Sequence, residues 1–214
     1  MRTNLIFHLL IFMLSLSTKA FSIDTTEDIG KKLFQEKCSE CHQQDGNSED
    51  PEIPNIAGTS AILTFDILDQ FKSGDKKSKS IKIEDSATTV DKTETNMNEI
   101  AKSLKTNEIE AISFFLAKQK SKSASQTFDQ ELAIKGKDIH MDLCENCHVD
   151  EGTNNIEDAS ILRGQWKNYL QSQFKVLSEG ERYMPRRMKK RFRKLSDEDK
   201  KALIEFYISP ISAN

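Results

Sequence analysis

Apolar residues recur three or four positions apart in several segments of the chain, which is the spacing of one buried helix face. In Asp28–Cys38, for example, Ile29, Leu33 and Phe34 fall on one face. The chain is therefore predicted to be all-α, with a small helical bundle in each half. The predicted helices are Asp28–Cys38, Ile62–Phe71 and Asn107–Ala117 in the first half and Leu132–Cys144, Trp166–Leu177 and Asp197–Ile208 in the second.

The two halves repeat each other at a constant offset, which indicates two copies of one domain. Up to Gly180 the offset is 106 residues; beyond it the offset is 91, so that Met97 pairs with Met188 and Leu104 with Leu195. The difference lies in Asp75–Asn96, a polar segment without helical periodicity that we predict to be a surface loop of the first half only. At the longer offset the identical pairs are Gly30 and Gly136, Cys38 and Cys144, Cys41 and Cys147, His42 and His148, Gly46 and Gly152, Gly58 and Gly164, and Gly74 and Gly180.

Each half contains one Cys-x-x-Cys-His pentapeptide, CSECH at Cys38–His42 and CENCH at Cys144–His148. This motif attaches c-type haem: the two thiols bond to the porphyrin and the adjacent His ligates the iron. The two motifs use all four Cys of the chain. A zinc site would bring its Cys pairs closer in sequence, and a dithiol redox pair would need a βαβ context. Two covalently attached haems are therefore the favoured interpretation.

The second axial ligand of each iron decides the class of haem protein, because Met gives an electron carrier whereas an open position allows ligand binding or catalysis. Met97 and Met188 occupy equivalent repeat positions and are the predicted ligands. Met184 is a rival for the second iron. His140, just upstream of the second motif, is a weaker competitor, and Met141 is expected to be a core residue.

Residues 1–22 are predicted to be a signal peptide, with Arg2 before the apolar run Leu5–Leu16. The run is too short for a comfortable membrane span, although a retained N-terminal anchor is the alternative. Because bacteria attach c-type haem outside the cytoplasmic membrane, we expect a periplasmic protein. The expected divisions of the mature chain, which has no further segment of membrane length, are a first domain at 23–118, a linker at 119–130 and a second domain at 131–214.

Charge is distributed unevenly between the halves. Asp24–Lys120 holds 13 basic and 19 acidic residues, a net of −6, whereas Ser121–Asn214 holds 16 and 15, a net of +1. Eight of the thirteen residues in Arg182–Lys194 are Arg or Lys. This segment is either a collar that steers an acidic partner or simply solvated surface. With no overall basic excess, nucleic-acid binding is not expected.

The whole mature chain resembles the dihaem, two-domain bacterial cytochromes c, which are built from two tandem class I cytochrome c folds. The segments Ile161–Phe174 and Tyr183–Leu195 look most like the cytochrome subunit of flavocytochrome c sulfide dehydrogenase. The resemblance implies thioether attachment at Cys38, Cys41, Cys144 and Cys147, proximal ligands His42 and His148, and distal ligands Met97 and Met188. It also implies a backbone carbonyl at Pro54 that orients the first proximal His, where the second half has Ser160.

Three functions are consistent with these features. The chain is a carrier of single electrons between a redox partner and the respiratory chain, the haem subunit of a flavoprotein sulfide dehydrogenase, or a haem sensor or peroxidase with one open iron. No nucleophile–base pair and no Gly-rich nucleotide loop is evident, so the chain is not expected to be catalytic alone. Its partner would be a flavoprotein dehydrogenase, a small cytochrome or a terminal oxidase.

Overall fold

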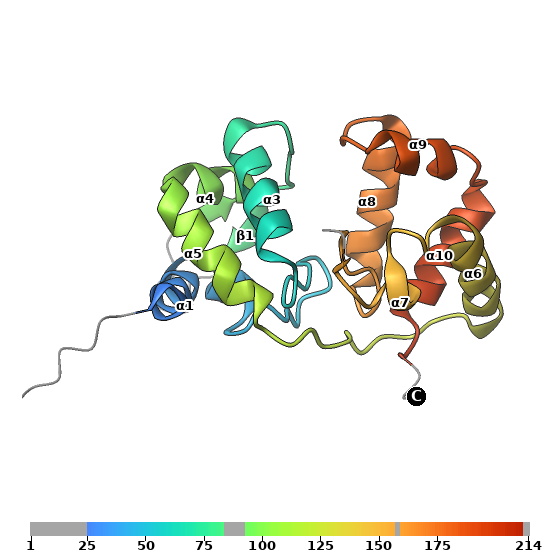
Figure 1. The fold of residues 1–214 in the computed structure, drawn as a ribbon, viewed down its shortest axis with the longest axis horizontal. Helices are drawn as coiled ribbons and strands as arrows, with labels where there is room; N and C mark the ends of the chain where they lie inside the picture. Colours follow the sequence, from blue (N-terminus) through green and yellow to red (C-terminus); the bar gives the residue numbers. More distant parts are fainter. Residues whose placement is uncertain (1–24, 84–92, 157–158, 212–214) are drawn as a thin grey trace, which may run out of the picture.

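The computed structural model describes residues 25–83, 93–156 and 159–211, and Figure 1 shows their helices in two groups joined by an extended segment. The predicted signal peptide at 1–22 lies outside the described residues. Within these residues, no helix combines the length and the apolar character needed to cross a membrane.

The first group contains five helices and a short hairpin. Its helices are α1 (Thr26–Lys37), α2 (Ser39–His42), α3 (Ala61–Ser73), α4 (Met97–Ser103) and α5 (Thr106–Ala117). A capping box between Thr25 and Asp28 begins α1, and Gly74 ends α3 in the left-handed conformation with φ of 90°. The three longer predicted helices are present, within about two residues at each end, whereas the short α4 was not predicted.

The second group repeats this order. Its helices are α6 (Gln130–Leu143), α7 (Val149–Gly152), α8 (Lys167–Glu179), α9 (Arg186–Phe192) and α10 (Asp197–Ile208). The bounds of α10 are those predicted from the sequence, because the Ser196–Asp199 capping box marks its start unambiguously. α7 is an irregular turn in which Asp150 and Glu151 have positive φ.

In each group the helix that leads into the haem motif packs closely against the last helix. A Cβ atom on Gly30 of α1 would lie 2.1 Å from the Ala111 carbonyl oxygen in α5, and one on Gly136 of α6 would lie 2.0 Å from the Ala202 carbonyl oxygen in α10. These repeated glycines are therefore required by close backbone contact.

Each group has its own hydrophobic core. In the first, Phe34, Leu68, Leu104 and Leu116 are among the buried members, and in the second Leu170, Leu203 and Tyr207 are. The prediction placed Ile29 on the buried face and Met141 in the core, and both are wrong: their side chains are 45% and 49% exposed. The buried faces of α1 and α6 are instead centred on the close-packed glycines and on Phe34 and His140.

The described part of the inserted segment of the first half contains regular structure that was not predicted. It contains the antiparallel strands β1 (Ile81–Ile83) and β2 (Thr93–Thr95), paired with Ile81 opposite Thr95. Such three-residue strands carry too little periodicity to be recognised in a polar sequence. The hairpin leads directly into Asn96, which caps α4.

Polar contacts join the two groups. The Asn55 N–H donates to Gln165 Oε1 at 2.9 Å, and Gln165 Nε2 donates to the Asn55 carbonyl at 2.8 Å. Trp166 Nε1 donates to the Ser48 carbonyl at 3.1 Å. Because these bonds link loops of both halves in both directions, they hold the two helix groups in a defined relation.

The segment predicted as a linker, 119–130, is attached along its length. The Lys122 N–H donates to Asn47 Oδ1 in the first half at 2.8 Å. The Ala124 N–H donates to the Gly164 carbonyl in the second half at 2.9 Å. Gln130, the last residue of the predicted linker, is already the first residue of α6.

Candidate haem-binding sites

The two Cys-x-x-Cys-His motifs form the same backbone turn. In the first, Cys38 ends α1 with its N–H on the Phe34 carbonyl (2.8 Å), and the His42 N–H donates to the Cys38 carbonyl (3.0 Å). In the second, the Cys144 N–H donates to the His140 carbonyl (2.8 Å), and the His148 N–H donates to the Cys144 carbonyl (3.0 Å). Each turn therefore presents two thiols and an imidazole from the C-terminal end of a helix.

Both histidine rings are oriented by a backbone carbonyl. Nδ1 of His42 lies 3.1 Å from the Pro54 oxygen, and Nδ1 of His148 lies 3.0 Å from the Ser160 oxygen. Because a carbonyl only accepts, Nδ1–H is the donor in each pair and Nε2 keeps its lone pair for a metal. The expectation of a carbonyl contact at Pro54 is confirmed, and Ser160 makes the same contact because a backbone oxygen does not depend on the side chain.

Equivalent hydrogen bonds in the two halves hold the loops that carry the Pro54 and Ser160 carbonyls. The Gly46 carbonyl accepts the Ile56 N–H at 2.7 Å, and the Gly152 carbonyl accepts the Leu162 N–H at 2.8 Å. The loops then close on the last helices, where the Gly58 N–H donates to the Leu116 carbonyl at 3.0 Å and the Gly164 N–H to the Tyr207 carbonyl at 2.9 Å.

Burial shifts the pKa values of both histidines and of the first Cys of each motif in the direction that favours the neutral form. It lowers the pKa of His42 to about 4, opposed by the Pro54 hydrogen bond, and it also lowers the pKa of His148. Burial raises the pKa of the Cys38 thiol to about 12 and that of Cys144. No two of the four cysteines are joined by a disulfide. Neutral imidazole suits iron ligation, whereas a raised thiol pKa does not suit a reactive dithiol.

Partly exposed apolar side chains pack against each core, as does the first Cys of each motif. These side chains include Leu33, Ile56 and Phe65 with Cys38 at the first core, and Ile139, Leu162 and Phe174 with Cys144 at the second. A porphyrin is a large apolar body, and covering these side chains with it would remove apolar surface from water. The residues present therefore fit a haem in both halves.

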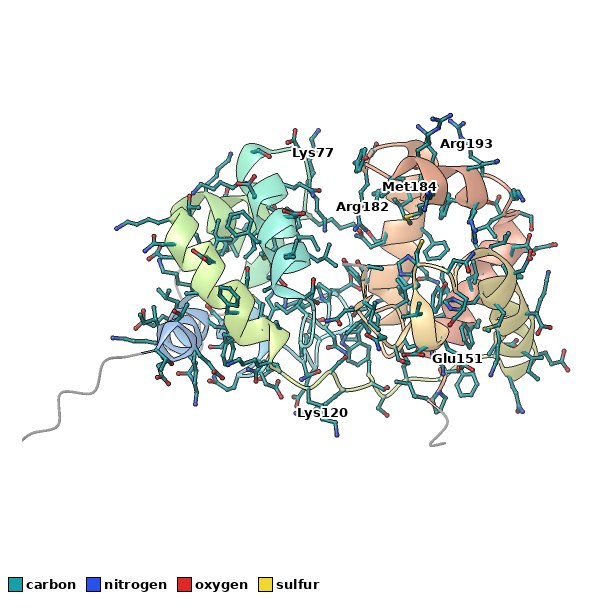
Figure 2. All side chains as sticks on the ribbon, viewed as in Figure 1. Lys77, Lys120, Glu151, Arg182, Met184 and Arg193 are labelled. Atoms are coloured by element: carbon teal, nitrogen blue, oxygen red, sulfur yellow. The ribbon has the colours of Figure 1, made fainter. Side chains whose placement is uncertain are left out.

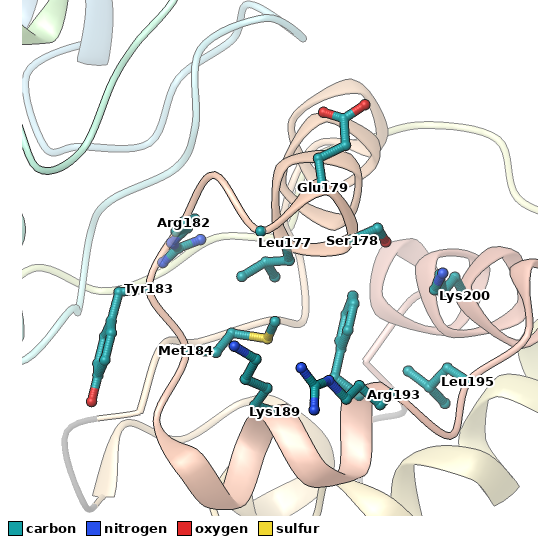
Figure 3. A pocket seen from close by; sticks show the side chains of 12 residues that line it. Leu177, Ser178, Glu179, Arg182, Tyr183, Met184, Lys189, Arg193, Leu195 and Lys200 are labelled. Atoms are coloured by element: carbon teal, nitrogen blue, oxygen red, sulfur yellow. The ribbon is translucent and has the colours of Figure 1, made fainter.

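The predicted distal ligands lie on short helices that the sequence analysis did not anticipate. Met97 is the first residue of α4 and packs against the first core. Met188 is the third residue of α9 and is half-buried. Its rival Met184 lines a cavity of about 490 Å³ between α8, α9 and the start of α10 (Figure 3). Which of Met184 and Met188 is the ligand stays a prediction.

His140, the weaker competitor, is fully buried and has both ring nitrogens occupied. Nδ1 lies 3.0 Å from the Tyr207 hydroxyl and Nε2 lies 2.8 Å from Glu145 Oε2. The same carboxylate accepts the N–H groups of Asp150 and Glu151, at 2.9 and 3.1 Å. This network was not predicted from the sequence, although an ionisable residue at the repeat position where the first half has Phe34 was a signal for it.

The basic collar, Arg182–Lys194, forms part of the wall of the cavity that Met184 lines. Arg182, Lys189 and Arg193 are its basic residues there (Figure 3). The Arg191 Nη1 donates to the Leu143 carbonyl at 2.9 Å, which ties α9 to the end of α6 next to Cys144. The collar is therefore attached to the haem motif of the second half.

Comparisons with known proteins agree with this geometry. Residues 28–120 match the family model described as cytochrome c. No curated protein matches the chain. Among solved structures, reduced recombinant cytochrome c4 from Pseudomonas stutzeri superposes with a TM-score of 0.66 at 24% identity, covering 85% of this chain and 97% of that one.

Two further structures have the same fold. Cytochrome c4 from Acidithiobacillus ferrooxidans gives a TM-score of 0.63 at 19% identity, with 82% and 99% of the two chains covered. Thiosulfate dehydrogenase from Marichromatium purpuratum gives 0.65 at 18% identity; the match covers 85% of this chain but only 40% of that one.

Residues 28–120 thus match a cytochrome c domain, and the chain as a whole has a two-domain fold similar to that of cytochrome c4. The match to cytochrome c implies covalently bound c-type haem, and each half supplies one attachment motif.

Proposed function

We propose that this protein is an exported dihaem cytochrome that carries single electrons between a redox partner and the respiratory chain in the periplasm. The observation that carries the proposal is the duplicated site, in which two thiols and a carbonyl-oriented imidazole recur in both halves. When bound, the haems supply one-electron redox chemistry. Cys38 and Cys41, and Cys144 and Cys147, would hold them covalently.

The residues of the chain position and tune that chemistry. The Pro54 and Ser160 carbonyls hold Nδ1 of the proximal histidines, which orients each ring and increases the basicity of Nε2. Met97 and Met188 are the proposed sixth ligands, and a thioether there would raise the reduction potential and close the iron to substrates. We also propose that the mature chain divides into a first domain at 23–118, a linker at 119–130 and a second domain at 131–214.

A second candidate is the haem subunit of a flavoprotein sulfide dehydrogenase. The resemblance of Ile161–Phe174 and Tyr183–Leu195 to that subunit favours it, and the thiosulfate dehydrogenase among the structural neighbours is another sulfur-compound oxidoreductase. In this case a separate flavoprotein would deliver the electrons. Purification of the native protein tests this directly, because a stoichiometric flavoprotein would accompany it.

Carbon monoxide separates an electron carrier from a sensor or peroxidase. The purified protein should contain two haems per chain by mass spectrometry and should titrate with two one-electron steps. If both irons are six-coordinate with His and Met, neither reduced haem should bind carbon monoxide rapidly. Rapid binding at one haem would contradict the proposal in favour of an open iron site.

A further inference from the structure

The two proximal histidines differ in backbone conformation although their rings make the same contact. His42 is the last residue of α2, and Gln43 follows it with φ of 57°. His148 lies just before α7, with φ of −101° and ψ of 68°. Nδ1 of each ring nevertheless lies beside an equivalent carbonyl oxygen, at 3.1 and 3.0 Å. The second half therefore directs its histidine to Ser160 by a different backbone turn.

The turn that follows His148 is left-handed at two successive residues that are not glycine. Asp150 has φ of 54° and ψ of 48°, and Glu151 has φ of 59° and ψ of 25°. This conformation is unfavourable for L-residues because Cβ crowds the next carbonyl oxygen, so it persists only where the surroundings hold it. The equivalent residues of the first half, Gln44 and Asp45, do not have positive φ.

The side chain of Glu145 holds this turn from inside the second haem motif. Its Oε1 accepts the Asp150 N–H at 2.9 Å, and its Oε2 accepts the Glu151 N–H at 3.1 Å. Oε2 also lies 2.8 Å from Nε2 of His140, whose side chain is fully buried. The carboxylate is therefore fixed in place by a buried ring while it binds the two left-handed residues.

The first half has neither of these supporting groups. Ser39 stands at the repeat position of Glu145, and its hydroxyl donates to the Gln35 carbonyl of α1 at 2.7 Å. Phe34 stands at the position of His140. The carboxylate, its histidine partner and the pair of left-handed residues thus occur together in the second half, and residues 34–46 of the first half lack all three.

The far end of the turn is attached to the loop that carries the Ser160 carbonyl. The Gly152 carbonyl accepts the Arg163 N–H at 3.1 Å, and Nη1 of Arg163 lies 3.6 Å from Glu151 Oε2. Figure 2 shows Glu151 at the end of the second group away from Arg193 of the basic collar. The turn therefore connects the proximal histidine to the loop whose carbonyl orients its ring.

We infer that Glu145, held by His140, is a positioning residue for His148. By binding the N–H groups of Asp150 and Glu151, it fixes the turn that directs the imidazole toward Ser160, and so fixes the plane of that imidazole on the second iron. Groups that contact a metal-ligating histidine indirectly in this way set its orientation. The inference rests on the proposed function, because it takes His148 as the proximal ligand of a covalently attached haem.

The test is the electron paramagnetic resonance spectrum of the oxidised holoprotein, after mass spectrometry has shown two haems in every variant. The g-values of a low-spin ferric haem depend on the orientation of its axial ligands. Glu145→Gln keeps the size of the side chain but replaces one accepting oxygen with an NH₂ group, which cannot accept from a backbone N–H. It should shift the g-values of one haem and leave those of the other unchanged.

Glycine at the two left-handed positions provides the rescue. Glycine adopts positive φ without support, so Glu145→Gln/Asp150→Gly/Glu151→Gly should recover the wild-type g-values. If the g-values of this triple variant stay shifted, Glu145 does not act by holding the turn and the inference is wrong. Should Glu145→Gln not accumulate, Glu145→Asp takes its place, because it keeps the charge, is one methylene too short to reach both N–H groups, and should shift the same signal.

Asp142→Asn is the matched control, because it removes a carboxylate charge from an exposed position of α6 close to the same motif. It should leave both sets of g-values as in wild type. Unchanged g-values in Glu145→Gln together with a raised reduction potential would show that Glu145 acts only through its charge, which would overturn the inference. A wild-type protein without two six-coordinate haems would instead contradict the proposed function, so the two failures can be told apart.

Discussion

Nδ1 of His140 lies 3.0 Å from the hydroxyl of Tyr207, at the place in the second helix pair where Phe34 and Leu116 pack in the first. Repeat register relates these positions, at offsets of 106 and 91 residues. A neutral imidazole satisfies both of its contacts when Nε2–H donates to Glu145 and Nδ1 accepts from Tyr207. The two halves therefore differ in polarity where their entering and final helices cross.

Replacing His140 with Phe should destabilise the holoprotein. The Tyr207 hydroxyl and the Glu145 carboxylate would lose a buried partner, and an unsatisfied buried polar group costs about 1–3 kcal/mol. The additional change Tyr207→Leu recreates the apolar pair of the first half and should recover part of the loss. Urea unfolding of the two variants measures both values. A single variant as stable as wild type would show that this network is not required.

The stability of the second domain should fall in mild acid. Burial holds the pKa of His140 below the 6.5 of a free imidazole, against the opposing effects of Glu145 and Glu151. Below 6.5 the unfolded chain therefore binds a proton that the folded chain does not, so the free energy of unfolding decreases as the pH falls through that value. Wild type should lose more stability between about pH 7 and about pH 5 than His140→Phe. Parallel pH profiles of the two proteins would contradict this.

Ala at either helix-crossing glycine should be poorly tolerated. The added Cβ of Gly136→Ala would meet the Ala202 carbonyl oxygen at 2.0 Å, and backbone cannot move aside as a flexible side chain can. We expect a loss of at least about 1–3 kcal/mol from overpacking, seen as a lower thermal midpoint. Asp138→Ala, at an exposed position of the same helix, is the control and should remain close to wild type.

The two candidate ligands of the second iron, Met184 and Met188, can be distinguished by the spectra of their variants. If Met188 is the ligand, Met188→Ala should convert one haem to a high-spin or ligand-accessible state and remove one sulfur-to-iron absorption band. Met184→Ala should leave both haem spectra nearly unchanged, although it enlarges the cavity beside α9. Met97→Ala serves as the reference for loss of a ligand in the first half. The opposite outcome for Met184 and Met188 would identify Met184 as the ligand.

The basic collar should govern the rate of association with an acidic redox partner. Arg186, Arg187, Lys189 and Lys190 are exposed on α9. Replacing all four with Gln should lower the association rate more than it changes the dissociation rate, and the wild-type rate should decrease with salt because exposed charges are screened over about 10 Å at 0.1 M. Stopped-flow reduction by the partner measures both.

The control for the collar removes four exposed lysines from the first half: Lys31, Lys32, Lys102 and Lys105. This variant has the same change in net charge, so it should match wild type if position rather than total charge matters. An electron-transfer rate that does not change with salt would contradict the steering role and show that the collar is only solvated surface.

The sequence by itself determined the parts of this protein that depend on local spacing. The pentapeptides specify their chemistry within five residues, and the longer helices follow from apolar periodicity and capping boxes such as Ser196–Asp199. Because the two halves are repeats, a feature of one half predicts the same feature in the other. The carbonyl contact at Ser160 could therefore be anticipated from the one at Pro54. All of these features rest on residues close together in the chain or in fixed register.

Only the tertiary structure decided which distant residues meet. The reciprocal bonds of Asn55 with Gln165 span 110 positions, and the bond from Trp166 Nε1 to the Ser48 carbonyl spans 118. Nor did periodicity show that Met141 is exposed while its neighbour His140 is buried in a polar network. The physical reason is that periodicity records which face of a helix is apolar, whereas the partner of each side chain depends on how the helices of both halves pack.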